Sequence, residues 1–368
     1  MASSPKKRRI FELDLLRGFF IIVIIIDHLQ FWPSPLTYIT GEGRLWVSAA
    51  EGFFLISGLL IGYIRGYKGK HAPLAAISKK LVARAFMLYV WGVAVSLLLI
   101  YFTLAVGNHA LLPALPSDSQ LSSVPTLLFN VLSGNYFNSW IYFLRLYAIM
   151  LLATPLFLLL LRKGYEKFVP LLIIAVYACS FVYPEAAFQW QVYFFSAALL
   201  GYRLEDVIAW FRSRPTIKRY FSAIILTTTL LSMMLSYHFV FGASTVSNAL
   251  LIPDPDSFST LRSSLNSFFS TQFVTIGRIL LSFVWFGGLL IAFHHVKPWL
   301  LKWLGWLLIP LGEKSLSGYI LQALVLPIIV VTIPVFSHSL LNGLFGVLVV
   351  LIIWALLKTK IIQKTIPR

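Results

Sequence analysis

Apolar segments as long as a lipid bilayer is thick recur along the whole chain, and they limit the folds open to it. A transmembrane helix needs about 20 such residues, and lipid forces a spanning segment to satisfy its own backbone hydrogen bonds. The sequence therefore predicts an all-α integral membrane protein, a bundle of about ten transmembrane helices. The expected spans are Leu13 to Trp32, Ala49 to Arg65, Ser78 to Val106, Trp140 to Leu161, Phe168 to Tyr183, Trp190 to Trp210, Tyr220 to Phe241, Thr271 to His294, Ser315 to Phe336 and Leu340 to Leu357.

The composition excludes a water-soluble protein. Hydrophobic residues make up 59% of the chain and charged residues 12%, whereas about 25% of a soluble domain is charged. The single cysteine, Cys179, excludes disulfides and thiolate metal sites. His294 and His295 diverge by about 100° on a helix and make a poor metal pair, so we expect no metal.

The net charge of +17 is distributed in a way that argues against a nucleic-acid partner. Lys and Arg cluster at every second helix end, as the positive-inside rule predicts for cytoplasmic loops. We therefore expect both termini in the cytoplasm and membrane lipid as the surrounding partner. The clusters are Lys6 to Arg9, Arg65 to Arg84, Arg162 to Lys167, Arg212 to Arg219, Lys297 to Lys302 and Lys358 to Arg368.

We expect residues 1–368 to form a single membrane domain that starts with a basic cytoplasmic segment, residues 1–12. The loops 107–139 and 242–270 are rich in Pro, Ser, Asn and Asp and contain almost no Lys or Arg, which indicates that they are extracytoplasmic. Together with residues 33–48 they are long enough to cover the outer end of the bundle, where we expect an acceptor to bind.

One apolar segment, Trp299 to Leu311, is too short for a span and contains Lys302 and Pro310. We expect it to lie in the membrane interface or to re-enter the membrane. A full crossing there would place the basic C-terminal tail outside, against the charge rule.

The first expected span carries an unusual set of ionisable residues: Asp14, Arg17, Asp27 and His28. Placing an ionisable side chain at the centre of a membrane helix costs at least about 2.5 to 3.5 kcal/mol of free energy. Each of these residues is therefore a candidate functional residue. Arg17 and His28 lie within about 20° of one line along the helix and roughly 16 Å apart. One face thus presents a guanidinium toward the cytoplasm and an imidazole toward the outside.

Each of these groups has two interpretations. Arg17 either forms an ion pair with Asp14 at the inner interface or binds an anionic phosphate or carboxylate from the cytosol. His28 is either an interfacial histidine bonded to a carbonyl or water, or a general base. Asp27 points about 100° away from His28, which makes it a poorer direct partner.

The second expected span combines a carboxylate with a stripe of small residues. Gly58, Gly62 and Gly66 repeat every four residues and predict a groove that lets another helix approach closely. If the first span fills this groove, Glu51 comes near the level of His28 and is able to orient the imidazole. The alternative for Glu51 is an ordinary interface carboxylate.

Two further cations, Arg145 and Arg278, lie in the outer parts of their expected spans. They either grip an anionic substrate or pair with a carboxylate, and the sequence leaves both alternatives open.

Two runs, LDLLRG in Leu13 to Gly18 and AAEGFFLISG in Ala49 to Gly58, are the most specific part of a resemblance that covers most of the chain. The sequence resembles the membrane acyltransferase-3 superfamily and, within it, the OpgC branch that succinylates periplasmic glucans. The run Leu13 to Gly18 (LDLLRG) is followed by ten residues between Arg17 and His28, which is similar to the family's Arg-x10-His signature. Residues Ala49 to Gly58 (AAEGFFLISG) resemble the OpgC branch in particular. Weaker similarities are Tyr142 to Tyr147 with Pro155, Phe188 to Gln191, and Leu311 to Leu316.

Two departures from the family pattern stand out. The family often has a His where this chain has Gln322, a change from which we expect no catalytic consequence. The chain also gives no sign of a fused extracytoplasmic hydrolase-like domain, which leaves the acceptor unspecified.

The resemblance implies a multi-pass protein of the bacterial cytoplasmic membrane that transfers an acetyl- or succinyl-type group from acyl-CoA, its donor substrate, to an extracytoplasmic glycan or glycolipid. It implies a catalytic set, a donor-binding set and a substrate-binding set. His28 is the base, Glu51 orients it and Asp27 lies beside it. The donor set is Arg17, Asp14, Lys79, Lys80 and Arg84, and the substrate set is Arg145, Tyr147, Trp190, Gln191 and Arg278.

Two other functions remain as alternatives. Buried cations and carboxylates also serve a transporter or flippase for an anionic solute, although the chain lacks the paired broken helices in matching halves that are typical of that class. A non-enzymatic sensor or assembly role is the third interpretation. The acyl group and the oligomeric state are left open by the sequence.

Overall fold

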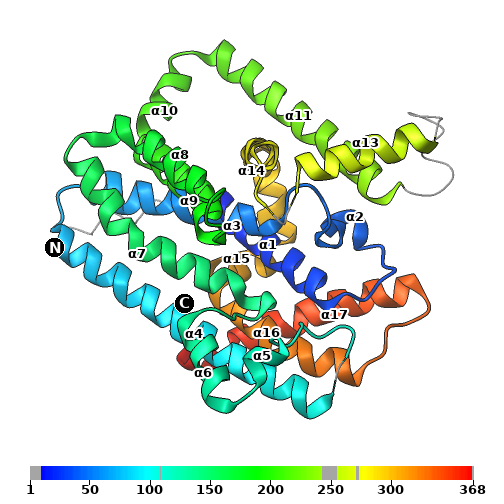
Figure 1. The fold of residues 1–368 in the computed structure, drawn as a ribbon. Coiled ribbons are helices and arrows are strands. Elements are labelled where there is room, and N and C mark those ends of the chain that lie inside the picture. The colour runs from blue at the N-terminus through cyan, green and yellow to red at the C-terminus, as the bar shows by residue number, and fades with distance from the viewer. Residues whose placement is uncertain (1–9, 108, 243–254, 271–272, 367–368) are drawn as a thin grey trace.

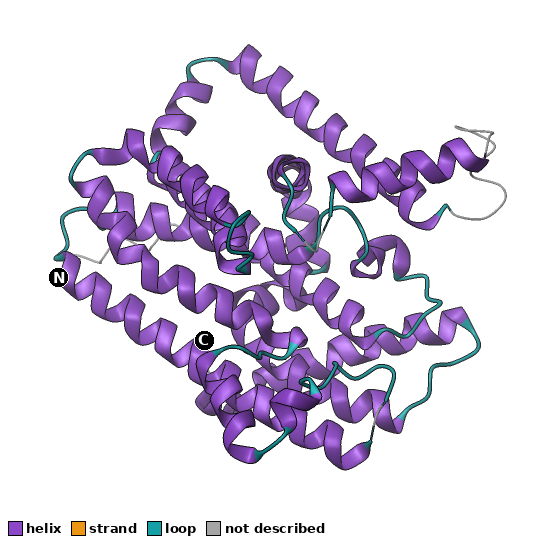
Figure 2. Ribbon diagram, in the orientation of Figure 1, coloured by secondary structure: helices purple, strands orange, loops and turns teal. Residues whose placement is uncertain are grey.

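The chain is described by a computed structural model that covers residues 10–107, 109–242, 255–270 and 273–366. Helices and connecting loops make up these residues, and no strand occurs among them (Figure 2). The predicted all-α class is therefore confirmed. Residues 1–9, most of the predicted basic N-terminal segment, lie outside the described part of the chain.

The helices follow one another along the chain with short connections. Their bounds are α1 (Phe11–Leu29), α2 (Thr37–Thr40), η1 (Gly41–Gly43), α3 (Ala49–Ile61), η2 (Gly62–Tyr67), α4 (Leu74–Val106), α5 (Asp118–Leu121), α6 (Val124–Ser133), η3 (Ser139–Ile141), α7 (Tyr142–Arg162), η4 (Tyr165–Phe168), α8 (Val169–Cys179), α9 (Ala186–Tyr202), α10 (Leu204–Arg212), α11 (Pro215–Phe241), α13 (Pro255–Phe268), α14 (Ile276–Trp303), α15 (Gly305–Glu313), α16 (Ser315–Thr332), α17 (Ser339–Lys358) and α18 (Lys360–Thr365).

Within the described residues, seven helical segments are long and apolar enough to cross a membrane, so the chain is a multi-pass membrane protein. They are Ala49–Tyr67, Leu74–Val106, Ser139–Arg162, Pro215–Phe241, Ile276–Trp303, Ser315–Thr332 and Ser339–Lys358. The other three expected spans correspond to α1, which carries charged residues, to α8 with 11 residues and to α9 with 17. The count of about ten and the cytoplasmic location of the termini stay predictions.

Two boundaries differ from those expected. The span predicted from Trp190 to Trp210 is broken at Arg203, where α9 ends and the short α10 begins. The segment Trp299 to Leu311 is divided, since α14 continues to Trp303 and α15 starts at Gly305. With nine residues, α15 is about 14 Å long, which is shorter than a bilayer is thick; that this segment makes no full crossing stays a prediction.

Helix α1 lies in the middle of the bundle, next to α3 (Figure 1). It contacts α3, α14, α15, α16 and α17, so its polar side chains face protein rather than lipid, as ionisable groups in membrane helices do. Its closest neighbour is α15: a Cβ on Gly18 would collide with the carbonyl oxygen of Leu308, and one on Gly312 with that of Asp14. Helices α11 and α13 lie at one edge of the molecule.

The small-residue groove on α3 and η2 is present, but α9 fills it. A Cβ on Gly58 or Gly62 would collide with the carbonyl oxygens of Phe194 or Ala198, both on α9. The condition under which Glu51 was expected to come near His28, that α1 fills this groove, is therefore not met. Helix α1 presents the bulky Phe20 ring to Gly52, whereas α9 presents small residues such as Gly201, and small residues on both sides let backbones approach.

Replacing Gly62 by Ala is expected to lower the thermal stability of the purified protein in detergent. The added methyl group meets backbone rather than a movable side chain, and overpacking of this kind costs about 1–3 kcal/mol. Gly287→Ala is the matched control, because a Cβ there lies 3.5 Å from Ile225 Cγ2, an ordinary contact. Equal melting temperatures for the two variants would contradict the close packing of η2 on α9.

Candidate functional site

A cavity of about 470 Å³ lies beside α1 in the centre of the bundle. Its wall combines residues of α1, α3, α4, α7, α9, α15 and α16 with Ser48 and with residues of η1 and η3. From α1 it receives Arg17, Ile24, Asp27 and His28. The expectation that Arg17 and His28 share a face of one helix is thus met, and both side chains line the same cavity.

His28 is held by a hydrogen bond and a stacked ring. Its Nδ1 lies 3.0 Å from Oε1 of Gln322 on α16, and its ring stacks on Trp140 with centroids 5.5 Å apart and planes inclined by 8°. In the tautomer in which Nδ1–H donates to this amide oxygen, Nε2 keeps a lone pair. Gln322, from which we expected no catalytic consequence, is therefore the side chain that orients the imidazole.

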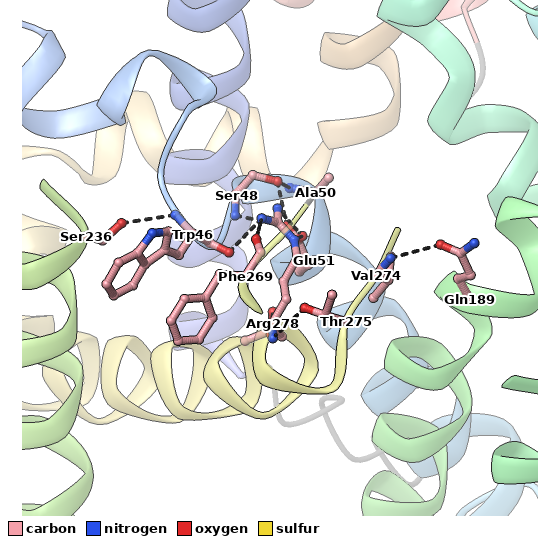
Figure 3. Close-up of polar contacts among 11 residues, drawn as sticks. Trp46, Ser48, Ala50, Glu51, Gln189, Ser236, Phe269, Val274, Thr275 and Arg278 are labelled. Atoms are coloured by element: carbon pink, nitrogen blue, oxygen red, sulfur yellow. Dashed lines mark hydrogen bonds and ion pairs between the residues drawn. The ribbon is translucent and has the colours of Figure 1, made fainter. Parts of the chain in front are cut away.

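Glu51 is fully buried and takes part in a different network (Figure 3). One carboxylate oxygen accepts hydrogen bonds from the backbone N–H and the hydroxyl of Ser48, at 3.0 and 2.5 Å, which closes a capping box at the start of α3. The other lies 2.6 Å from Nε and 2.5 Å from Nη2 of Arg278. The predicted contact between Glu51 and His28 is therefore wrong, because the carboxylate is engaged by its own helix cap and by α14.

Arg278 is equally occupied. Besides its bonds to Glu51, its Nη1 donates to the carbonyl oxygen of Trp46 at 2.6 Å, and its exposed fraction is 2%. It lies outside the cavity lining, so it corresponds to the carboxylate-pairing alternative rather than to a substrate contact. Together Glu51 and Arg278 tie α3, α14 and the segment before α3 to one another.

The end of the cavity beside His28, which we call the outer end after the orientation predicted from the charges, contains a carboxylate that sequence reasoning missed. Glu42 lines the cavity together with Asp27 and Gly43, and it accepts a hydrogen bond from the Thr37 hydroxyl at 3.0 Å. Its φ of 54° is a left-handed conformation that is uncommon for a residue other than glycine. The glycines on either side of Glu42, Gly41 and Gly43, both have positive φ. This Gly-Glu-Gly run was the signal in the sequence from which Glu42 could have been singled out.

The opposite end of the cavity, beside Arg17 and called the inner end after the same predicted orientation, is basic. A neighbouring cavity of about 190 Å³ shares Arg17 and Arg84 with the main one and adds Arg65 and Lys80. The predicted donor residues Arg17, Lys80 and Arg84 are thus brought together, and Arg65 was missed although it stands in a predicted basic cluster. Lys79 and Lys80 are both exposed, but Lys79 lies outside both linings.

Asp14 also lies outside both cavity linings. Its backbone carbonyl contacts Gly312 in the close packing of α1 on α15.

The remaining predicted substrate residues divide into two groups. Tyr147 and Trp190 line the main cavity. Arg145 does not; it donates to the hydroxyl of Tyr142 at 2.7 Å and pairs with Glu185 at 3.1 Å. Gln191 donates to the carbonyl oxygen of Ile173 at 2.8 Å and joins α9 to α8. Both are therefore structural contacts in this arrangement.

Aromatic side chains form the middle of the cavity wall between its two polar ends. Phe53, Phe54, Phe143 and Tyr319 line it together with Tyr147 and Trp190, and they contact one another as tilted or edge-to-face pairs. Within the described residues, no three His, Cys, Asp or Glu side chains gather as metal ligands. The cavity thus joins a basic end, an apolar middle and an end with an imidazole and two carboxylates.

Comparison with known proteins identifies the family of the chain. No curated protein and no solved structure matches the chain. Residues 9–363 match the family described as OpgC protein, a stretch that contains α1, the cavity and nearly every helix described above. The chain therefore belongs to the OpgC family.

Proposed function

We propose that the chain is a membrane O-acyltransferase that moves an acetyl- or succinyl-type group from cytosolic acyl-CoA to a hydroxyl of an extracytoplasmic glycan or glycolipid. Its place is the bacterial cytoplasmic membrane, with both termini inside. Membership of the OpgC family supports acyl transfer to glucans. The observation that carries the finer proposal is the single cavity whose lining includes Arg17 and Arg84 as well as His28.

The basic inner end suits the donor. Coenzyme A carries several phosphate groups, and guanidinium groups bind phosphate through paired hydrogen bonds. Nε of Arg17 is buried and has no hydrogen-bond partner among the described residues. A buried donor of this kind is costly unless a ligand satisfies it. In the proposal, Arg17, Arg65, Lys80 and Arg84 hold the phosphates, and the acyl arm extends along the aromatic wall.

The outer end suits the acceptor. Nε2 of His28 takes the proton of the acceptor hydroxyl, whose oxygen attacks the thioester carbonyl carbon. The tetrahedral intermediate collapses, the carbon–sulfur bond breaks, and the thiolate of coenzyme A receives the proton from the imidazolium. Gln322 holds the imidazole by Nδ1, and the Trp140 ring stacked on it stabilises the charged form.

Proteoliposomes in which the protein is inserted in one orientation test this function directly. Labelled acetyl-CoA or succinyl-CoA is supplied on one face and an oligoglucan on the other, and label on the glucan is measured. We expect transfer only when the donor is on the side of Arg65 and Lys80. Thioester hydrolysis without labelled glucan, or solute uptake that is independent of coenzyme A, would refute the proposal and favour the transporter class.

Two neighbouring lysines provide a matched test of the donor site. Lys80→Gln and Arg17→Gln are expected to raise KM for acyl-CoA about 10- to 100-fold, since a hydrogen bond to a charged group contributes about 1.5–3 kcal/mol. Lys79→Gln removes the same charge from a neighbouring position that is also exposed but does not line the cavities, and it should leave KM near that of the wild type. Similar KM values for the Lys79 and Lys80 variants would show that bulk surface charge, not this cavity, binds the donor.

A further inference from the structure

Two arginines lie in loops where the positive-inside rule predicts few cations. The three long loops that our proposal places outside, residues 33–48, 107–139 and 242–270, contain two Lys or Arg residues in all, Arg44 and Arg262. Topology gives no reason for cations there, because the rule depletes them from outer loops. The fold nevertheless brings these two residues, which are far apart in the sequence, to the wall of one pocket.

This pocket has a volume of about 270 Å³ and is separate from the main cavity. Nη2 of Arg262 donates to the carbonyl oxygen of Val240 at 3.0 Å, which occupies one of the five N–H groups of a guanidinium. The Arg44 guanidinium lies 5.0 Å from the centre of the Phe241 ring and 3.4 Å from Glu42. Two cations facing one carboxylate leave the pocket with a net positive charge.

Trp46, which also lines the pocket, is held in place by several contacts. Its backbone N–H donates to the Ser236 hydroxyl at 3.0 Å, its carbonyl oxygen accepts from Arg278 at 2.6 Å, and its ring stacks on Phe269 at 4.4 Å (Figure 3). The indole N–H donates to Asn266, also in the pocket wall, at 3.1 Å. A site with its walls held in this way loses little conformational entropy when a ligand binds.

The pocket adjoins the outer end of the main cavity through two residues of the chain. Arg44 lines the pocket, and Glu42, with which it pairs, lines the main cavity beside Asp27 and His28. A glycan that reaches across Arg44 and Glu42 from the pocket to the main cavity is able to place an anionic group in the pocket and a hydroxyl near His28.

We infer that the pocket formed by Arg44, Arg262, Asn266 and Trp46 is an anion subsite, which binds a phosphate or carboxylate carried by the acceptor glycan. Guanidinium groups suit both anions, since their fork of donors matches two oxygens. This assignment rests on the proposed function for the identity of the acceptor, but anion binding by the pocket is measurable without any transfer reaction.

The first test measures binding of glucose 6-phosphate, glucuronate and glucose to the purified full-length protein in detergent. Saturation-transfer NMR detects the bound sugar. We expect the two anionic sugars to bind and glucose to bind at least tenfold more weakly. Arg44→Gln and Arg262→Gln should each weaken the anionic sugars about tenfold, whereas Arg214→Gln, an exposed arginine near Trp210, should not. Equal binding of glucose and glucose 6-phosphate, or unchanged binding in both pocket variants, would overturn the inference.

The second test uses turnover, with a neutral oligoglucan and the same oligoglucan carrying a phosphate. In the two pocket variants, KM should rise about tenfold for the phosphorylated acceptor only, with kcat and the neutral-acceptor KM unchanged. Equal changes for both acceptors would overturn the subsite. Absence of transfer to either acceptor in the wild type would instead refute the proposed function and leave the binding result to decide the pocket.

A lipid headgroup is the other source of a phosphate at this level. Glucose 6-phosphate binding is therefore repeated in nanodiscs of phosphatidylcholine and of phosphatidylglycerol. We expect the same affinity in both. Displacement of the sugar phosphate by phosphatidylglycerol would assign the pocket to lipid and overturn its assignment to the acceptor.

Discussion

Replacement of His28 by Ala is expected to lower the rate of acyl transfer by about 10²- to 10⁴-fold, the usual contribution of a positioned general base. Its ring is the imidazole that the structure places in the main cavity. Binding of acyl-CoA should persist, because the basic inner end is unchanged. Turnover and donor binding are measured on the same preparation, with the melting temperature as evidence of folding.

Two variants make this experiment specific. His294→Ala removes an exposed imidazole that pairs with Glu12 outside the cavity and should retain normal turnover. Gln322→Leu leaves His28 in place but removes its partner at Nδ1, so we expect a lower kcat with little change in KM for acyl-CoA. A folded His28→Ala protein with wild-type turnover would remove His28 from the mechanism.

Replacement of Glu51 by Ala is expected to cause the largest loss of stability, about 3–5 kcal/mol, because it leaves the buried Arg278 guanidinium without its carboxylate. The same change removes one half of the capping box at the start of α3. A lower midpoint of thermal unfolding in detergent is the measured result. The turnover number is then compared only at temperatures where the variant is folded.

An exposed ion pair provides the control for this prediction. Arg203 pairs with Asp206 at 2.8 Å, with side chains 48% and 63% exposed, and Asp206→Ala should change stability by less than about 1 kcal/mol. Combining Glu51→Leu with Arg278→Met should be less destabilising than the sum of the two single changes, because neither charge is then left unpaired. A Glu51→Ala protein as stable as Asp206→Ala would contradict the buried network.

Features that depend on local periodicity could be predicted from the sequence. The apolar segments indicated helices, and the eleven-residue spacing of Arg17 and His28 placed both on one face of α1, since rotation along a helix is fixed at about 100° per residue. The Gly58 and Gly62 spacing predicted a close helix contact for the same reason. The motif in α1 and α3 also indicated the family that residues 9–363 match.

Features that depend on which helices are neighbours could not be predicted in this way. A small-residue groove accepts any helix with a matching surface, and α9, not α1, supplies that surface. The carboxylate of Glu51 consequently meets Arg278, 227 residues away in the chain, while His28 meets Gln322, 294 residues away.

The sequence by itself thus determined the class of the protein, its helices and the polar face of α1, because lipid and helical geometry act on each segment alone. Only the tertiary structure decided that this face lines a cavity with a basic inner end, that Gln322 orients the imidazole, and that Arg44 and Arg262 share a pocket. These arrangements depend on side-chain packing between segments distant in the chain, and that packing leaves no periodic signal in any one of them.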